Sequence, residues 1–272
     1  MPVSLIVLTD FFQAANRALD YATNLAEPLG ARLVLLHVHR DSVIDPEMFT
    51  GKLSNLSKEA INLAMRSLAS NLTVPVVAEV GHGRVASAAV DTASRHQPAL
   101  IVLGRPDYPS TPDELVHTTS LDILRLAPFP LLVVPHARAT TAPPRRVLVA
   151  VDGEPFGLGK NAFSARHLLN CLSAEVTVLY VAPDAEAQDL GSAALEAVRQ
   201  ASLVANPTHL RMRTVVHDNP GRGILATAQA TEYDLVVLIT RPRSFLGRLF
   251  HRSITSQVLL HSPLPVLIVP AL

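Results

Sequence analysis

Short apolar runs alternate with longer amphipathic stretches along the whole chain. The runs of Val, Ile and Leu, such as those at 4–8 and 33–36, are continuous, which is typical of parallel strands buried on both faces. The Ala- and Leu-rich stretches between them have helical length. This pattern predicts strands near 3–9, 32–38, 74–80, 99–104, 130–134, 146–151, 175–181, 211–217, 234–239 and 265–269, and helices near 12–29, 50–71, 84–96, 118–126, 160–172, 187–205, 221–231 and 253–261.

The chain also repeats itself once. The segment LRLAPFPLLVVP at 124–135 matches LLHSPLPVLIVP at 259–270, and the same 135-residue offset places PALIVLGR at 98–105 on YDLVVLIT at 233–240. A polar, Pro-containing stretch without apolar periodicity separates the two copies. We therefore predict two domains, at 1–136 and 146–272, and a linker at 137–145.

Repeated β-α units build a doubly wound, Rossmann-like domain, here with a five-stranded parallel sheet in each copy. Ligands of such folds bind beyond the carboxyl ends of the strands, which in the first copy are the loops after Leu8, Val38 and Leu103. Asp10 and Asp152 stand at corresponding strand ends, where a carboxylate could contact a base or a ribose. A turn or helix-capping role is the alternative for both acids.

Composition excludes several classes of function. The formal net charge is +0 at pH 7, so the chain lacks the positive field that non-specific nucleic-acid or membrane binding needs. No apolar run is long enough to span a bilayer, and the N-terminus is typical of a strand and not of a signal peptide. Cys171 is the only cysteine, and its apolar surroundings predict buried packing. We expect a cytoplasmic protein with neither membrane insertion nor nucleic acid as a partner.

Candidate chemistry is sparse. The chain has no G-x-S-x-G elbow, no P-loop and no H-E-x-x-H motif, so we expect binding and not catalysis, with weak ATP hydrolysis as the enzymatic alternative. His37 with His39, and His82 with His117, form pairs without a convincing third ligand, so no metal site is predicted.

A family likeness lies in the strand-end Asp, in Val38 and Val181, in the loop after the fourth strand and in the closing Pro-x-Pro strand. In these features both copies resemble the universal stress protein family. Nucleotide-binding members of that family carry Gly, two residues, Gly, nine residues, then Gly-Ser or Gly-Thr in this loop, beside a helix N-terminus that binds phosphate. The matching positions are Gly104, Asp107, His117 and Thr118 in the first copy and Ile239, Pro242, Arg252 and Ser253 in the second.

The resemblance implies an adenine nucleotide alpha hydrolase-like fold and ATP as the candidate ligand. It also implies antiparallel pairing of the two closing strands, which would make the chain an intrachain pseudo-dimer. A stress-response binding or regulatory role with an unknown protein partner follows from the same likeness. Further assembly into a homodimer and regulation of a separate membrane transporter are alternatives.

Five of the six glycines of the two loops are replaced, which predicts degenerate ATP-binding loops. Asp107 repels phosphate, Pro242 lacks an N–H donor, and Ile239 does not easily adopt positive φ. The second loop instead gathers arginines, whose guanidinium groups bind phosphate, so a side-chain anion site is the alternative there. The candidate ligand-binding residues are Asp10, Val38, Gly104, Arg105, His117, Thr118, Asp152, Val181, Thr240, Arg241, Arg243, Arg252 and Ser253.

Overall fold

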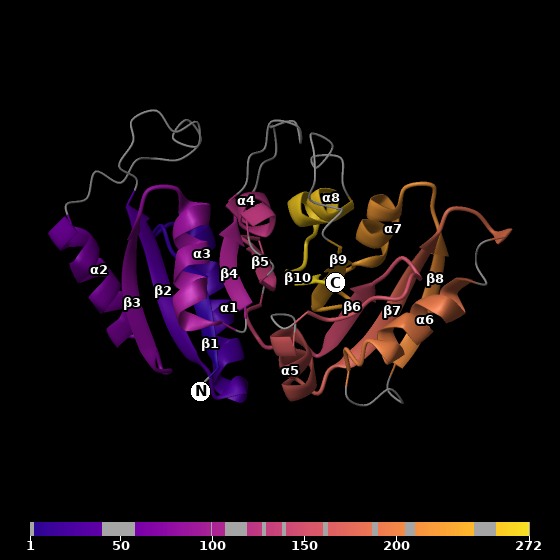
Figure 1. Cartoon of the computed structure of the whole chain (residues 1–272), viewed down its shortest axis with the longest axis horizontal. Helices are drawn as coiled ribbons and strands as arrows, with labels where there is room; N and C mark the ends of the chain where they lie inside the picture. The colour runs from indigo at the N-terminus through magenta and orange to yellow at the C-terminus, as the bar shows by residue number, and fades with distance from the viewer. Residues whose placement is uncertain are drawn as a thin grey trace.

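The computed structural model describes residues 3–39, 58–98, 100–106, 119–126, 129–137, 140–159, 163–186, 190–204, 210–241 and 254–271. Two α/β halves lie side by side (Figure 1). The first half comprises β1 (Ser4–Leu8), α1 (Gln13–Leu29), β2 (Arg32–His39), α2 (Lys58–Ser70), β3 (Val76–His82), α3 (Val85–His96), β4 (Leu100–Arg105), α4 (Thr119–Leu126) and β5 (Leu131–Pro135). The second comprises β6 (Arg146–Ala150), α5 (Phe163–Cys171), β7 (Glu175–Ala182), α6 (Gly191–Gln200), β8 (Leu210–Val216), α7 (Pro220–Thr227), β9 (Leu235–Thr240), α8 (Ile254–His261) and β10 (Val266–Pro270).

The predicted succession of strands and helices is confirmed, although α6 and α7 are shorter than predicted. Ser202 adopts a φ of 50°, which ends the helical backbone soon after α6. The chain turns tightly after α7, where the N–H of Gln229 donates to the carbonyl of Thr227 at 2.8 Å. This turn brings Asp234 to the start of β6, which a longer helix would prevent.

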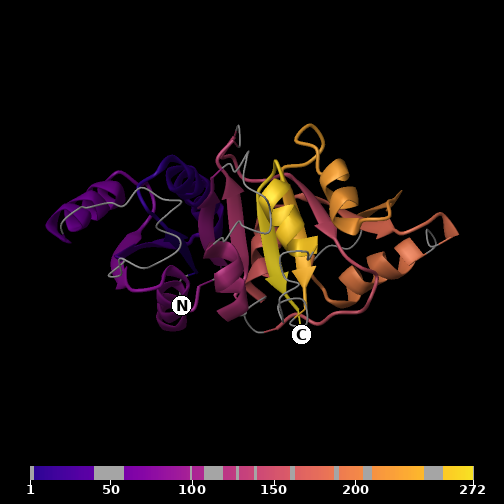
Figure 2. The same cartoon turned by 90° about the horizontal axis from the view of Figure 1, so that it is seen from above.

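One sheet runs through both halves in the order β3-β2-β1-β4-β5-β10-β9-β6-β7-β8. Strands are parallel within each half, and β5 and β10 pair antiparallel at the centre, with Leu132 opposite Leu267. The predicted intrachain pseudo-dimer is therefore confirmed. The view from above places β10 near the middle of the molecule (Figure 2). The closing strands, which lie at the end of each domain in sequence, are thus not edges of the sheet.

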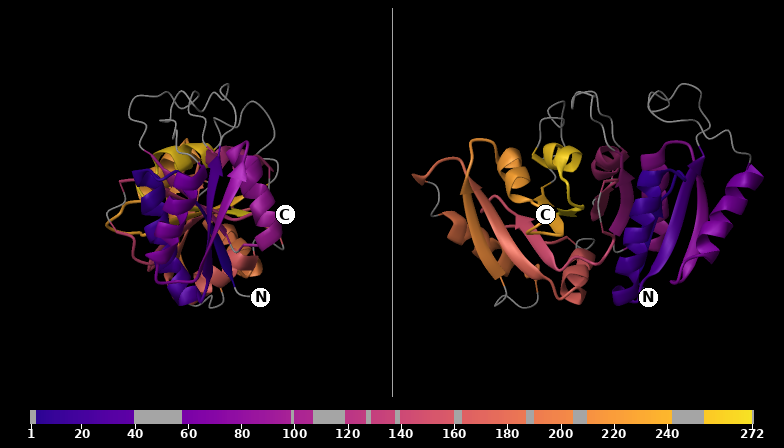
Figure 3. Two further views of the ribbon diagram at one scale, coloured as in Figure 1. Left: turned by 90° about the vertical axis from the view of Figure 1, so that its left-hand side faces the viewer. Right: turned by 180° about the vertical axis from the view of Figure 1, so that it is seen from behind.

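Apolar side chains form one core on each face of this sheet. Leu131 and Val133 project into the core beneath α3, α4, α7 and α8, whereas Leu132 and Val134 project into the core beneath α1, α2, α5 and α6. The view from behind shows α1 and α5 close together on that second face, where they are in contact (Figure 3). Because both cores cross the β5–β10 junction, the halves are held together by apolar burial as well as by strand pairing.

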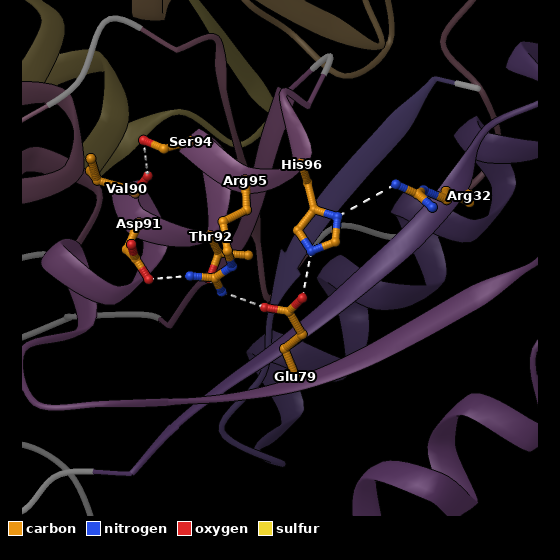
Figure 4. A network of polar contacts seen from close by, with 8 residues as sticks. All are labelled: Arg32, Glu79, Val90, Asp91, Thr92, Ser94, Arg95 and His96. Carbon is orange, nitrogen blue, oxygen red and sulfur yellow. Dashed lines mark hydrogen bonds and ion pairs between the residues drawn. The ribbon is translucent and has the colours of Figure 1, made fainter. Parts of the chain in front are cut away.

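A polar network fastens the outer strand β3 to the end of α3 (Figure 4). The Glu79 carboxylate accepts hydrogen bonds from Arg95 Nη2 at 2.6 Å and from the His96 ring at 2.5 Å, and Arg95 also pairs with Asp91. Burial raises the pKa of Glu79, but the hydrogen bonds from His96 and Arg95 outweigh it, so the pKa lies below its usual value. The edge strand of the first half is therefore anchored by charge as well as by the sheet.

A second ion pair joins the starts of β6 and β9. The Asp234 carboxylate accepts from Arg146 Nη2 at 2.8 Å and from the backbone N–H groups of Arg145 and Arg146 at 3.1 and 3.0 Å. Burial raises the pKa of Asp234, but the hydrogen bonds from Arg146 and Arg145 lower it by more, so the pKa lies below its ordinary value. The stabilisation is therefore present above the ordinary Asp pKa and is lost as the pH falls through the lower folded-state value.

Asp234→Asn is expected to lower the free energy of unfolding by about 1 kcal/mol at neutral pH, after allowance for solvent screening. The loss should shrink as the pH falls through the lowered folded-state pKa of Asp234, because the wild-type carboxylate then also becomes protonated. A series of urea unfolding curves from neutral to acid pH measures it. Asp122→Asn, which removes only a surface pair with Arg125, is the control and should change little. A loss at Asp234 that did not depend on pH would contradict this assignment.

Candidate functional site

Each half places a candidate site where its strand order reverses, between β1 and β4 and between β6 and β9. These are the carboxyl ends at which the sequence predicts ligand loops. We call them the first and the second strand-end site. The first comprises Asp10, Phe11, His37, Gly104 and Arg105, and the second comprises Asp152, Gly153, Tyr180, Thr240 and Arg241.

Both strand-end acids stabilise the turn that follows them. Asp10 Oδ1 accepts from the N–H of Phe12 at 2.9 Å, and Asp152 Oδ1 accepts from the N–H of Glu154 at 3.1 Å. Both acids therefore have the turn-stabilising role that the sequence analysis gave as the alternative. Asp10 has no basic partner in the described part of the chain, whereas Asp152 pairs with Arg241. The two sites therefore differ in how their acid is paired.

An aromatic ring lies beside Asp10 in the first site. Phe11 has a φ of 66°, whereas the corresponding residue of the second half, Gly153, has a φ of 82°. A side chain in this left-handed region costs about 1–2 kcal/mol relative to glycine. The Phe11 ring stacks on His37, with ring centroids 4.7 Å apart and planes inclined by 32°. His37 is buried, and its Nδ1 lies 2.9 Å from the carbonyl of Thr9, so Nδ1 carries the proton.

Gly104, the glycine that the first loop retains, is required by packing. A Cβ at this position would lie 2.1 Å from the carbonyl oxygen of Ala14, because the end of β4 passes close to the start of α1. No side chain fits this approach between two backbones. The glycine is thus explained without a phosphate.

Arg105 reaches into the other half of the molecule. Its Nη1 donates to the carbonyl of Leu259 at 2.6 Å and its Nη2 to the carbonyl of Ser262 at 2.8 Å, at the end of α8. The guanidinium is therefore occupied by backbone carbonyls. The sequence placed Arg105 among the candidate site residues but gave no sign of this contact, because Arg105 lies in the first repeat and both of its partners lie in the second.

Arg241 fills the second site. Its Nη1 pairs with the Asp152 carboxylate and lies 3.6 Å from the Glu154 carboxylate, while its Nη2 donates to the carbonyls of Glu154 and Pro155 at 3.1 and 3.2 Å. The side chain is 24% exposed. The neighbouring Thr240 is 2% exposed, and its Oγ1 has no hydrogen-bond partner in the part of the chain that the structure describes.

The remaining predicted site residues divide into two groups. Val38 and Val181 pack against the core beneath α3 and α7, and a Cβ on Gly223 of α7 would lie 2.6 Å from Val181 Cγ1. Val181 therefore contacts α7, and Val38 packs against the same core. The others, together with the rest of the two loops, lie outside the described residues: His117, Thr118, Arg243, Arg252 and Ser253.

The prediction of a buried Cys171 is wrong, because the residue is exposed at the end of α5. Its Sγ lies 3.6 Å from His167 Nε2, one helical turn earlier. His39 is the last residue of β2, and its ring centroid lies 6.1 Å from that of His82. Across the described ranges, no group of three or more His, Cys, Asp or Glu residues is arranged to hold a metal ion. No helix within those ranges is long and apolar enough to cross a bilayer.

Comparison with known proteins agrees with the tandem α/β fold described above. The sequence profile described as the universal stress protein family matches residues 4–135 and again 144–270. No curated protein matches the sequence. Among solved structures, a universal stress protein from Archaeoglobus fulgidus superposes with a TM-score of 0.70 at 16% identity, covering 98% of each chain.

Two further structures share the tandem arrangement. A putative universal stress protein from Pseudomonas aeruginosa gives a TM-score of 0.59 at 18% identity, covering 98% of this chain and 93% of that one. The cytoplasmic domain of a prokaryotic cation chloride cotransporter gives 0.55 at 11% identity, covering 100% and 96%. These likenesses establish the fold, and a fold shared this widely does not by itself identify a ligand.

Gly104→Ala is expected to lower the free energy of unfolding by about 3 kcal/mol, because the backbone of Ala14 cannot move aside cheaply. Gly153→Ala is the matched control, since the nearest atom to its new Cβ would be 3.6 Å away and only backbone strain, about 1 kcal/mol, remains. Urea unfolding measures both variants. Equal losses would contradict the role given to Gly104.

Proposed function

The chain belongs to the universal stress protein family, and we propose that it acts as a stress-response binding module that contacts a protein partner without needing a bound nucleotide. In this proposal the domains at 1–136 and 146–272 form the working pseudo-dimer, and a homodimer is not required. The module works in the cytoplasm, where a single unpaired cysteine is stable.

The contacts of Arg241 are the main support for this proposal. A phosphate group needs cations with free donors, but both terminal nitrogens of Arg241 already contact the second site's own loop. The cluster combines one guanidinium with the carboxylates of Asp152 and Glu154, so its net charge is negative. A polyphosphate would have to displace both carboxylates or bind beside them, and like charges at such distances repel.

The first strand-end site also argues against ATP binding, through different residues. Phe11 and His37 stack on each other, so neither ring face between them is available to a purine. Asp10 adds a negative charge without a basic partner in the described chain, and Arg105 is engaged with α8. Gly104 serves packing. Each site is therefore filled or charged in a way that disfavours ATP.

Addition of 1 mM Mg-ATP is expected to leave the melting temperature of the purified chain unchanged. A site with a Kd of about 10 µM would stabilise the protein by about 2.7 kcal/mol under these conditions, raising the melting temperature by roughly 5–10 °C. A rise of that size would contradict nucleotide-independent action. Phosphate release from ATP, measured in parallel, should equal that of buffer, and turnover above it would favour the enzymatic alternative.

Arg241→Ala is expected to lower the free energy of unfolding by about 1–3 kcal/mol, because it leaves Asp152 and two backbone carbonyls without their donor. Arg211→Ala is the control, because it removes an arginine from an exposed pair with Glu175 at 3.3 Å and should change stability by less than about 1 kcal/mol. Unchanged stability of Arg241→Ala, combined with loss of an ATP response, would instead assign Arg241 to an anion site.

A further inference from the structure

The contact of Arg105 with α8 joins the first strand-end site to a helix of the other half. The last carbonyls of a helix have no partner within the helix and lie at the negative end of its dipole. Arg105 supplies two donors and a positive charge there, to the carbonyls of Leu259 and Ser262. Ser262 is fully buried, and its hydroxyl donates to the carbonyl of Leu264 at 2.9 Å. The contact is therefore partly shielded from water, which strengthens charge-assisted hydrogen bonds.

The main chain of Arg105 is held by β5 and by the close approach of the preceding residue to α1. Gly104, directly before it, lies against the carbonyl of Ala14 at the start of α1. The carbonyl of Arg105 accepts from the N–H of His136 at 2.9 Å, and the residue pairs with Pro135 of β5. A shift of the turn that contains Phe11 would move the start of α1, and with it the strand end that positions the guanidinium.

The described part of the second half shows no equivalent contact. Thr240 occupies the position that corresponds to Arg105 in the repeat, and its short side chain has no hydrogen-bond partner in the described chain. The hydrogen bonds that Arg105 makes to the other half therefore have no counterpart from Thr240.

We propose that Arg105 couples the first strand-end site to α8, so that a change at the first site alters the stability of the last turn of α8. The guanidinium fork spans two carbonyls at once, so it holds or releases them together. The effect extends toward α7, which packs on α8. This coupling is independent of nucleotide, because any partner that displaces the end of β4 would produce it.

Hydrogen exchange measured by mass spectrometry on the full chain tests the proposal. Arg105→Ala is expected to speed exchange in a peptide covering 254–262 by about tenfold, with a much smaller change in a peptide covering 119–126 of α4. Thr240→Val is the control, and it should leave α8 exchange unchanged. An equal rise in every peptide would show only general destabilisation and would overturn the proposal.

A double-mutant cycle separates coupling from a merely structural bond. Phe11→Gly, which keeps the left-handed turn without strain, should change α8 exchange in the wild-type background and leave it unchanged in the Arg105→Ala background. The same change in both backgrounds, or none in either, would overturn the proposal. If Arg105→Ala does not fold, Arg105→Lys takes its place, because one ammonium group cannot reproduce the fork, and the same outcomes apply.

Discussion

The antiparallel pairing of β5 with β10 holds the rest of the structure in place. Each of these strands closes its own domain and is buried on both faces, so either one alone would leave an apolar edge with unpaired N–H and C=O groups. Pairing them removes both edges and lets the two cores run through the junction. It also brings α8 to the end of β4, where Arg105 can reach it.

The two halves have the same backbone fold, but different side chains occupy their strand-end sites. In the first, an aromatic ring stacks on a buried histidine beside an acid, and in the second, a guanidinium lies among carboxylate and carbonyl oxygens. Both arrangements use the chain's own groups at the position where related folds bind ligands. The Rossmann-like architecture is therefore retained, and we propose that the chain's own groups take the place of a nucleotide in both halves.

The fold could be predicted from sequence because its signals are local and repeated. Apolar runs such as 4–8 and 33–36 predicted the parallel strands, and the repeat predicted two domains. The antiparallel pairing of their closing strands was implied by the family resemblance. The site could be predicted only in part, since spacing located Asp152 and Arg241 but did not reveal that they bind each other. The stacking of Phe11 depends on a positive backbone φ that residues other than glycine rarely adopt. The only sign of this φ in the sequence is Gly153 at the matching position of the second half. Contacts between repeats, such as that of Arg105, leave no periodic signal.

If the chain's own groups occupy both strand-end sites, as we propose, the protein does not retain nucleotide. The most direct test is mass spectrometry of the small molecules released when freshly purified protein is denatured. We expect no adenine nucleotide in stoichiometric amount. Release of about one ATP or other adenine nucleotide per chain would contradict it.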